Sequence, residues 1–155
     1  MNVAYVRVST VEQNEARQVE ALKRHNIDRW FIEKVSGKNM DRPELQKMLK
    51  SVQPGDTVFI HDFSRLARST KDLLEMVETL QANGVHLASD KENLDTGTPT
   101  GKLMLTMIAA INEFERHLFD VLHEQVEKRI LTVTDAAKQL GVTRQTWYRI
   151  AEQNR

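Results

Sequence analysis

Hydrophobic residues recur with two different periods along the first part of the chain. Residues 3–8 (VAYVRV) alternate as in a strand and are rich in β-branched side chains. Similar short apolar runs follow at residues 30–35, 57–61 and 85–88. Between these runs, apolar residues recur at helical spacing. Strands that alternate with helices predict an α/β fold with a largely parallel sheet.

Start signals place the first two helices. Thr10 and Gln13 form a capping box for a helix that extends to about His25. Asp41 can cap the second helix, which carries Pro43 in its first turn. We therefore expect a helix after each of the first two strands.

A third helix and a polar stretch follow. Ser69 or Thr70 can cap this helix, and Gly84 ends it. Residues 90–101 are polar and rich in Gly and Thr, which favours a mobile loop. The acidic residues of this stretch could bind a cation, although solvated loop carboxylates are the more common arrangement: Asp90, Glu92 and Asp95.

Residues 102–130 contain no Pro or Gly and predict one long helix. Its apolar residues are spaced alternately by three and four positions: Met104, Met107, Ile111, Phe114, Leu118 and Val121. A second apolar edge contains Leu105, Ile108 and Leu122. Such a seam packs along another surface, either the chain's own sheet or a second copy of the helix. The helix is longer than a small domain can cover, so we favour a homodimer.

The C-terminal residues predict a helix-turn-helix. Thr134 can cap a short helix, Gly141 can form the turn, and Thr143 can cap a second helix whose Trp147 faces inward. Polar residues of this segment, the two caps included, could contact bases and phosphates of double-stranded DNA, so the candidate DNA-binding residues are Thr134, Thr143, Arg144, Gln145, Thr146, Tyr148 and Arg149. An ordinary helical hairpin with a polar outside is the alternative.

Composition and charge narrow the class of protein. The 155 residues carry 22 basic and 22 acidic side chains, but residues 128–155 carry six basic and only two acidic ones. A basic end suits phosphate binding or a solvated tail. There is no cysteine, which excludes thiol chemistry and suits a reducing cytoplasm. No apolar run approaches the roughly 18 residues of a membrane span, so no membrane partner is expected.

Candidate chemistry begins at the end of the first strand. Tyr5, Arg7 and Ser9 are spaced by two and share one strand face. Ser9 falls where the strand ends, which is where sites form in open α/β sheets. A lone serine at this place is more often a simple helix cap than a catalytic group.

Arginines near the ends of other strands change that balance. Arg65 and Arg68 follow the third strand at positions i and i+3, so one helical turn would point both the same way. Arg42 begins another helix. Guanidinium groups bind phosphate through two hydrogen bonds, and phosphoryl transfer depends on positioning and charge neutralisation. A serine beside four arginines, without a metal-ligand cluster, predicts attack on a phosphodiester with no metal or other cofactor.

Several motifs together resemble the serine recombinases of the resolvase/invertase family. They are Tyr5-x-Arg7-x-Ser9-Thr10 with Gln13, Ser36-Gly37 followed by Asp41-Arg42-Pro43, Arg65-Leu66-x-Arg68, Gly101-Lys102, and Glu113-Phe114-Glu115-Arg116. The resemblance covers nearly the whole chain. It implies a catalytic α/β domain at residues 1–100, a dimerisation helix at 101–131 and a DNA-binding helix-turn-helix at 132–155.

The resemblance also implies a reaction. Ser9 would attack DNA and form a 5′-phosphoserine bond, with Arg7, Arg65 and Arg68 on the scissile phosphate. Arg42 would assist, and Tyr5 and Gln13 would shape the pocket. Two homodimers would pair as a tetramer, cut, rotate and rejoin the strands. The covalent bond conserves the ester energy, so neither ATP nor a metal is implied.

Three departures from the family pattern stand out. Ser64 and Glu33 occupy positions where family members commonly carry Asp. The basic arm that usually follows the long helix is missing, and only two helices of the DNA reader are evident. We expect residues 121–130 to serve as its missing first helix, because two short helices cannot bury enough apolar area alone. A truncated, weakly active DNA-binding protein is the alternative function.

Overall fold

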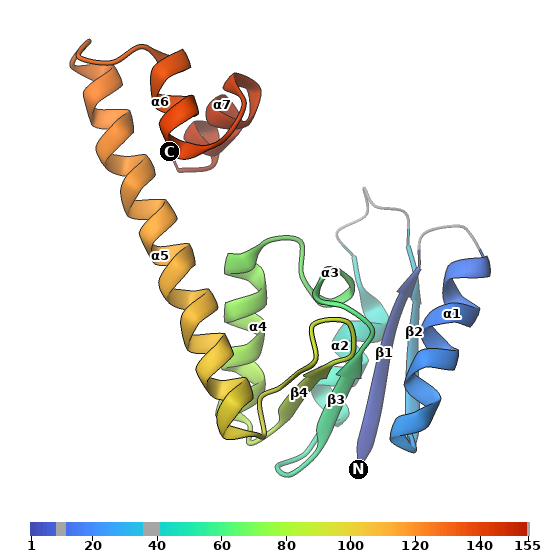
Figure 1. Ribbon diagram of the computed structural model, residues 1–155. Coiled ribbons are helices and arrows are strands. Elements are labelled where there is room, and N and C mark those ends of the chain that lie inside the picture. Colours follow the sequence, from blue (N-terminus) through green and yellow to red (C-terminus); the bar gives the residue numbers. More distant parts are fainter. Residues whose placement is uncertain (9–11, 36–40, 155) are drawn as a thin grey trace. The chain divides into compact units, whose positions relative to one another are not determined.

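Figure 1 shows the chain as a computed structural model. The structure describes residues 1–8, 12–35 and 41–154, with the backbone alone for residues 12–14. The chain forms two compact units, Met1–Ile108 and Ala109–Arg155. Within the described ranges, no helix is long and apolar enough to cross a membrane.

The first unit is built on a five-stranded sheet with the order β2-β1-β3-β4-β5. The interior strand β1 (Asn2–Val8) pairs in parallel with β2 (Arg29–Lys34) and with β3 (Thr57–Ile60). Strand β4 (His86–Ser89) pairs in parallel with β3, and the short β5 (Leu94–Asp95) pairs antiparallel with β4. The predicted mostly parallel sheet is confirmed.

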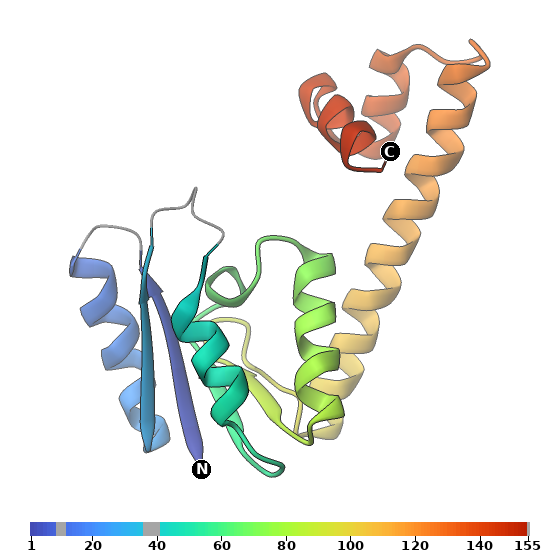
Figure 2. The ribbon, with the colours of Figure 1, turned by 180° about the vertical axis from the view of Figure 1, so that it is seen from behind.

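Helices cover both faces of this sheet (Figures 1 and 2). Helix α1 (Glu12–Leu22) packs on one face, where Leu22 joins Ala4 and Val6 in an apolar cluster. Helices α2 (Pro43–Ser51) and α4 (Thr70–Ala82) pack on the other face, in the larger core. Side chains of β1 are therefore buried on both sides, as expected for an interior parallel strand.

The start of α2 is stabilised by a side chain from a neighbouring strand. The buried Glu33 carboxylate accepts hydrogen bonds from the backbone N–H groups of Glu44 and Leu45, at 2.9 and 3.1 Å. Arg42 occupies the N-cap position. The prediction that Asp41 caps this helix is wrong, because Glu33 satisfies the N–H groups that a capping side chain would bind.

Two other helices agree more closely with the sequence. Helix α1 continues into a short 3-10 turn at Lys23–His25, so the helical segment ends where predicted. Thr10 lies outside the described residues, and its capping role stays a prediction. Ser69 caps α4 as expected, because its Oγ accepts a hydrogen bond from the backbone N–H of Asp72 at 3.1 Å.

Residues 90–101 are more ordered than their composition predicts. They contain β5 and the start of α5 (Pro99–Glu127), so the expectation of a loop throughout is wrong. The Thr96 hydroxyl accepts a hydrogen bond from the backbone N–H of Leu87 at 2.8 Å, which ties this segment to β4. A Cβ atom at Gly101 would lie 1.7 Å from the Asp95 carbonyl oxygen, so only glycine fits this close approach.

The second unit consists of the end of α5 with α6 (Val133–Leu140) and α7 (Arg144–Gln153). Trp147 is 2% exposed and packs with Phe119 and Leu122 of α5 and with two alanines of α6, Ala136 and Ala137. The end of α5 therefore completes a three-helix core. Residues 121–130 were expected to serve as the first helix of this unit, and Leu122 and Val126 of that segment do pack in the core. Leu118 and Phe119, which precede the segment, pack there as well.

The turn between α6 and α7 follows the sequence prediction closely. Gly141 is left-handed at φ 78°, and Thr143 caps α7 by accepting a hydrogen bond from the N–H of Thr146. The cap of α6 is Thr132 and not Thr134, because the helix already begins at Val133. Thr134 instead lies exposed in the first turn of α6.

Candidate active site

The candidate site lies at the edge of the sheet where β1 and β3 end, beside the one-turn helix α3 (Phe63–Leu66) (Figure 1). Tyr5 and Arg7 come from β1 and contact groups on the face opposite α1, as their spacing predicts. Ser9 follows this strand directly but lies outside the described residues. Gln13 lies in α1, and its side chain also falls outside the described part.

Arg7 is held against the backbone of α3. Its Nε donates to the carbonyl oxygen of Arg65 at 3.1 Å, and its Nη2 donates to that of Ser64 at 2.7 Å. These carbonyl groups lie in the single turn of α3, whose last carbonyls have no helical partner. Helix α3 therefore fixes the side chain that lies two residues before Ser9.

Arg42 reaches the same turn from the start of α2. Its Nη1 donates to the Leu66 carbonyl at 2.7 Å and its Nη2 to the Arg65 carbonyl at 2.6 Å. Its Nε donates to the Tyr5 hydroxyl at 3.2 Å, and the guanidinium carbon lies 5.5 Å from the centre of the Tyr5 ring. Arg42 and Arg7 thus share the Arg65 carbonyl as an acceptor, and Arg42 also joins Tyr5 to this turn.

Arg65 is held by two acceptors on different elements. Its Nε lies 3.4 Å from an Asp62 carboxylate oxygen, and its Nη1 lies 3.4 Å from the Arg7 carbonyl oxygen. The Arg7 carbonyl also accepts from Gln18 Nε2 of α1 at 3.2 Å. Arg65 thus reaches back to β1, while Arg7 reaches forward to α3.

Arg68 departs from the predicted arrangement. Helix α3 ends at Leu66, and Ala67 is extended with φ −130° and ψ 158°, so Arg65 and Arg68 do not share a helical turn. Arg65 lines a cavity of about 430 Å³, whereas Arg68 and Arg42 line another of about 380 Å³. The prediction that one helical turn carries both Arg65 and Arg68 is wrong, because α3 ends at Leu66.

The arginines lie close enough to affect one another's ionisation. Burial lowers the pKa of the Arg7 guanidinium, and the positive charges of Arg42, Arg65 and Arg68 lower it further. Burial also raises the pKa of the Tyr5 hydroxyl, against the opposing effect of Arg42. Like charges gathered in this way favour an anion such as a phosphodiester.

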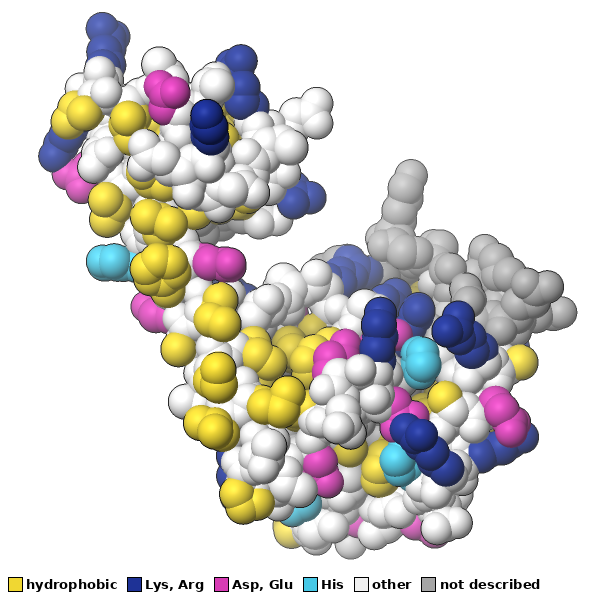
Figure 3. All heavy atoms as spheres, viewed as in Figure 1, with side chains coloured by type: hydrophobic (Ala, Val, Ile, Leu, Met, Phe, Trp, Pro, Cys, Tyr) yellow, Lys and Arg dark blue, Asp and Glu magenta, His cyan; other side chains and the backbone are white. Residues whose placement is uncertain are grey.

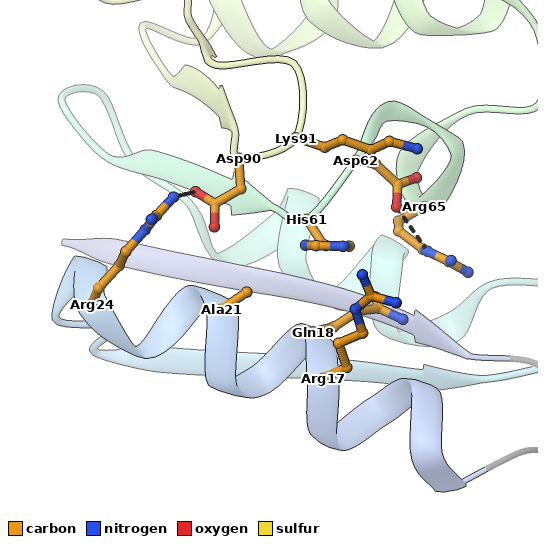
Figure 4. A pocket seen from close by; sticks show the side chains of 9 residues that line it. All are labelled: Arg17, Gln18, Ala21, Arg24, His61, Asp62, Arg65, Asp90 and Lys91. Atoms are coloured by element: carbon orange, nitrogen blue, oxygen red, sulfur yellow. Dashed lines mark hydrogen bonds and ion pairs between the residues drawn. The ribbon is translucent and has the colours of Figure 1, made fainter.

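Figure 4 shows the cavity that Arg65 lines, between α1 and the ends of β3 and β4. Arg17 and Gln18 reach it from α1, and His61 and Asp62 reach it from the end of β3. Arg17, Gln18 and Asp62 were not predicted from the sequence. Asp62 could have been identified from the sequence, because it is an acidic residue that follows a buried strand and precedes Arg65 by three positions.

No metal centre emerges among the side chains that the structure describes, since they form no group of three or more His, Asp or Glu residues able to bind an ion. The acidic residues considered as a less common cation site form hydrogen bonds within the chain. Asp90 accepts from His25 at 2.6 Å, and the Asp95 carboxylate accepts from the N–H of Gly97 at 2.8 Å. Glu92 accepts a hydrogen bond from Ser89.

The candidate DNA-binding residues lie on α6 and α7. Arg144, Gln145, Tyr148 and Arg149 are exposed on α7, opposite the buried Trp147. The hydroxyl groups of Thr143 and Thr146 hydrogen-bond to each other at 3.0 Å at the start of the helix. Four of the predicted side chains therefore form one exposed polar face, whereas two belong to the helix cap.

The predicted seam of α5 is exposed over much of its length. Phe114 is 66% exposed, and Met107 and Ile111 are both 56% exposed. Leu105 instead packs on the core of the first unit, and Leu118 packs in the core of the second. Figure 3 shows hydrophobic side chains following one another along this helix. A row of exposed apolar residues of this kind is typical of an interaction surface.

Comparison with known proteins gives consistent matches. Residues 2–137 match the family described as "Resolvase, N terminal domain". The chain is 44% identical over 119 residues to the transposon Tn21 resolvase of Escherichia coli, covering 75% of this chain and 62% of that protein. It is 40% identical over 118 residues to a DNA-invertase of Escherichia phage P1, covering 76% of this chain and 63% of that protein. The chain thus spans less than two thirds of the length of these relatives.

A solved structure supports the same match. The N-terminal catalytic domain of TP901-1 integrase aligns with a TM-score of 0.66 at 30% sequence identity, covering 76% of this chain and 98% of that domain. A resolvase-family recombinase from Streptococcus pneumoniae shares the fold, with a TM-score of 0.56 at 23% identity, 83% coverage of this chain and 95% of the other.

Proposed function

Because this chain belongs to the resolvase/invertase family of serine recombinases, we propose that it is a site-specific recombinase that cuts and rejoins double-stranded DNA. The observation that carries this proposal is the convergence of Arg7, Arg42 and Arg65 around α3, at the end of the strand that leads into Ser9. Three guanidinium groups gathered at the end of this strand suit a phosphodiester better than any neutral substrate.

The proposed step is an exchange of phosphate esters. The Ser9 Oγ attacks the phosphorus atom, the O–P bond to serine forms, and the bond from phosphorus to the 3′ oxygen breaks. The serine proton is lost and the leaving 3′ oxygen gains a proton, so a free 3′ hydroxyl and a 5′-phosphoserine bond result. Rejoining is the reverse reaction with a new 3′ hydroxyl. Because one ester replaces another, the step consumes no ATP.

The arginines would act by positioning and by charge. Negative charge spreads over the non-bridging oxygens in the transition state, and guanidinium groups held in advance stabilise it without reorganising. We assign Arg7, Arg65 and Arg68 to the scissile phosphate. Arg42 is already bonded to Tyr5 and to α3, and it would assist by keeping this frame in place. Gln13 would shape the pocket together with Tyr5.

A denaturing gel tests this function. The full chain is incubated with DNA that flanks its own gene and carries nicks which trap cleaved ends. We expect a covalent protein–DNA band for the wild-type chain, no such band for Ser9→Ala, and an undiminished band for Ser51→Ala. Ser51 is a suitable control because its hydroxyl bonds to the Met48 carbonyl at the end of α2. A band of full intensity with Ser9→Ala would refute the assignment of the nucleophile.

We further propose that the enzyme is a homodimer formed along α5, and that two dimers pair as a tetramer on DNA. The exposed Met107, Ile111 and Phe114 support this proposal, because contiguous apolar residues on a long helix are costly to leave in water. The lack of cysteine suits a reaction in the reducing cytoplasm.

The exposed face of α7 is the proposed DNA reader, with Arg144 and Arg149 as its positive groups. Replacing both by alanine should weaken binding in a band-shift assay and reduce its dependence on salt, since each phosphate contact releases a counterion. The chain lacks the usual basic arm, so we expect a shallower salt dependence than that of a relative that carries the arm. An equally steep dependence would contradict this expectation.

A further inference from the structure

Asp62 stands out among the acidic residues near the arginine cluster. It lies between the end of β3 and α3, and its side chain is 9% exposed. Its carboxylate accepts a hydrogen bond from the Ser64 hydroxyl through one oxygen and lies 3.4 Å from Arg65 Nε through the other. Figure 4 shows Asp62 and Arg65 joined at the rim of the cavity.

The carboxylate is not needed to start the helix. Asp62 occupies the N-cap position of α3, where an aspartate usually accepts backbone hydrogen bonds, but its side chain makes no such bond. The N–H of Phe63 instead lies 3.4 Å from a carboxylate oxygen of Glu92. The Asp62 oxygens are therefore committed to the side chains of Ser64 and Arg65.

The local charges favour an ionised Asp62. Burial opposes ionisation, but the Ser64 hydrogen bond and the positive charges of Arg65 and His61 outweigh it, so that the pKa of Asp62 lies below its ordinary value. Arg42 and Arg65 both lie near Arg7, and Asp62 supplies a compensating negative charge beside Arg65. A carboxylate on Nε leaves the outer end of the guanidinium directed to the Arg7 carbonyl and the cavity.

We propose that Asp62 is the positioning residue for Arg65, and that the pair Asp62–Ser64 supplies the negative charge that Ser64 alone cannot. This role rests on the proposed recombinase function. Asp62 touches neither the scissile phosphate nor Ser9 in this scheme. It acts by fixing the direction of one guanidinium, and a displacement of about 1 Å in such a group costs roughly 100-fold in rate.

The test uses four full-length variants and two measurements. Asp62→Asn removes the charge, and Ser64→Ala removes only the hydroxyl. Asp56→Asn is the matched control, because Asp56 is also buried, with 10% of its side chain exposed, and precedes the opposite end of the same strand. Asp62→Asn combined with Ser64→Asp returns a carboxylate to the cluster, at a side chain that already contacts position 62.

The first measurement is the rate at which the covalent protein–DNA complex forms on DNA flanking the gene, followed as a band on a denaturing gel. The second needs no DNA: it is the NMR signal of the Arg65 Nε–H proton and its exchange with water. We expect Asp62→Asn to slow formation of the covalent complex about 100-fold and to speed exchange of the Arg65 Nε–H proton with water. Ser64→Ala should have a smaller effect on both. Asp56→Asn should match the wild type in both, and the double variant should recover in both.

The two measurements separate the possible failures. If the wild-type chain forms no covalent band, the recombinase function fails, and the Arg65 signal still decides whether Asp62 orders that side chain. Unchanged Arg65 exchange in Asp62→Asn would overturn the inference, whatever the band does. So would a double variant no better than Asp62→Asn alone, because charge would then not be the property that matters.

Discussion

Replacing Glu33 by alanine should destabilise the first unit and loosen Arg42. Glu33 is 2% exposed, and one carboxylate oxygen accepts both N–H groups at the start of α2. Leu45 is 3% exposed, so its N–H would lose its acceptor without gaining water. A buried unsatisfied N–H costs about 1–3 kcal/mol, and loss of a helix cap costs about 1 kcal/mol. We therefore expect a loss of about 3 kcal/mol.

This loss can be measured by urea denaturation. The chain has two tryptophans, and Trp30 lies in β2, close to Glu33. In a Trp147→Phe background, Trp30 fluorescence reports on the first unit alone. With a slope near 2 kcal/mol per molar urea, Glu33→Ala should lower the midpoint by about 1.5 M.

A control variant and a threshold for the loss of unfolding free energy decide the outcome. Glu20→Ala removes an exposed carboxylate that pairs with Lys23, and exposed pairs contribute little, so its midpoint should match the wild type. A loss below about 0.5 kcal/mol for Glu33→Ala, the size of an ordinary surface effect, would refute the reasoning that this carboxylate holds α2 and Arg42.

Three further predictions address other parts of the chain. Gly101→Ala should lower the thermal midpoint of the first unit, because the added Cβ would collide with the Asp95 carbonyl. An unchanged midpoint would contradict this, since it would show that the backbone at residues 95 and 101 can move apart at no cost in stability. Phe114→Glu should shift sedimentation from dimer to monomer while the helical circular dichroism stays constant, since Phe114 is largely exposed within one chain. The difference in unfolding free energy between the wild type and Asp62→Asn should shrink as pH falls below 3.8, because the pKa of folded Asp62 lies below that value and protonation removes its advantage; a difference independent of pH would contradict this.

The long elements, and the shared strand face of Tyr5 and Arg7, were predictable because their signals are local. Alternation in residues 3–8 indicates β1, and the spacing of Tyr5 and Arg7 puts them on one face. Gly141 and Thr143 mark the turn between α6 and α7, where backbone geometry depends on single residues. Such features need no knowledge of distant segments.

The features that escaped prediction depend on tertiary contacts. A single turn such as α3 is too short to give a periodic pattern, so the separation of Arg65 from Arg68 could not be foreseen. Asp41 looks like a cap in the sequence, but Glu33 arrives from another strand and takes that role. The importance of Asp62 appears only when α3 is folded against β1.

The most direct test of the account is to identify the atom that carries the DNA. The covalent complex is digested with nuclease and protease, and the peptide that retains a nucleotide is sequenced by mass spectrometry. We predict a nucleotide joined through its 5′ phosphate to Ser9. A nucleotide on another residue, or cleaved DNA with no attached peptide, would contradict the claim that the arginine cluster serves this hydroxyl.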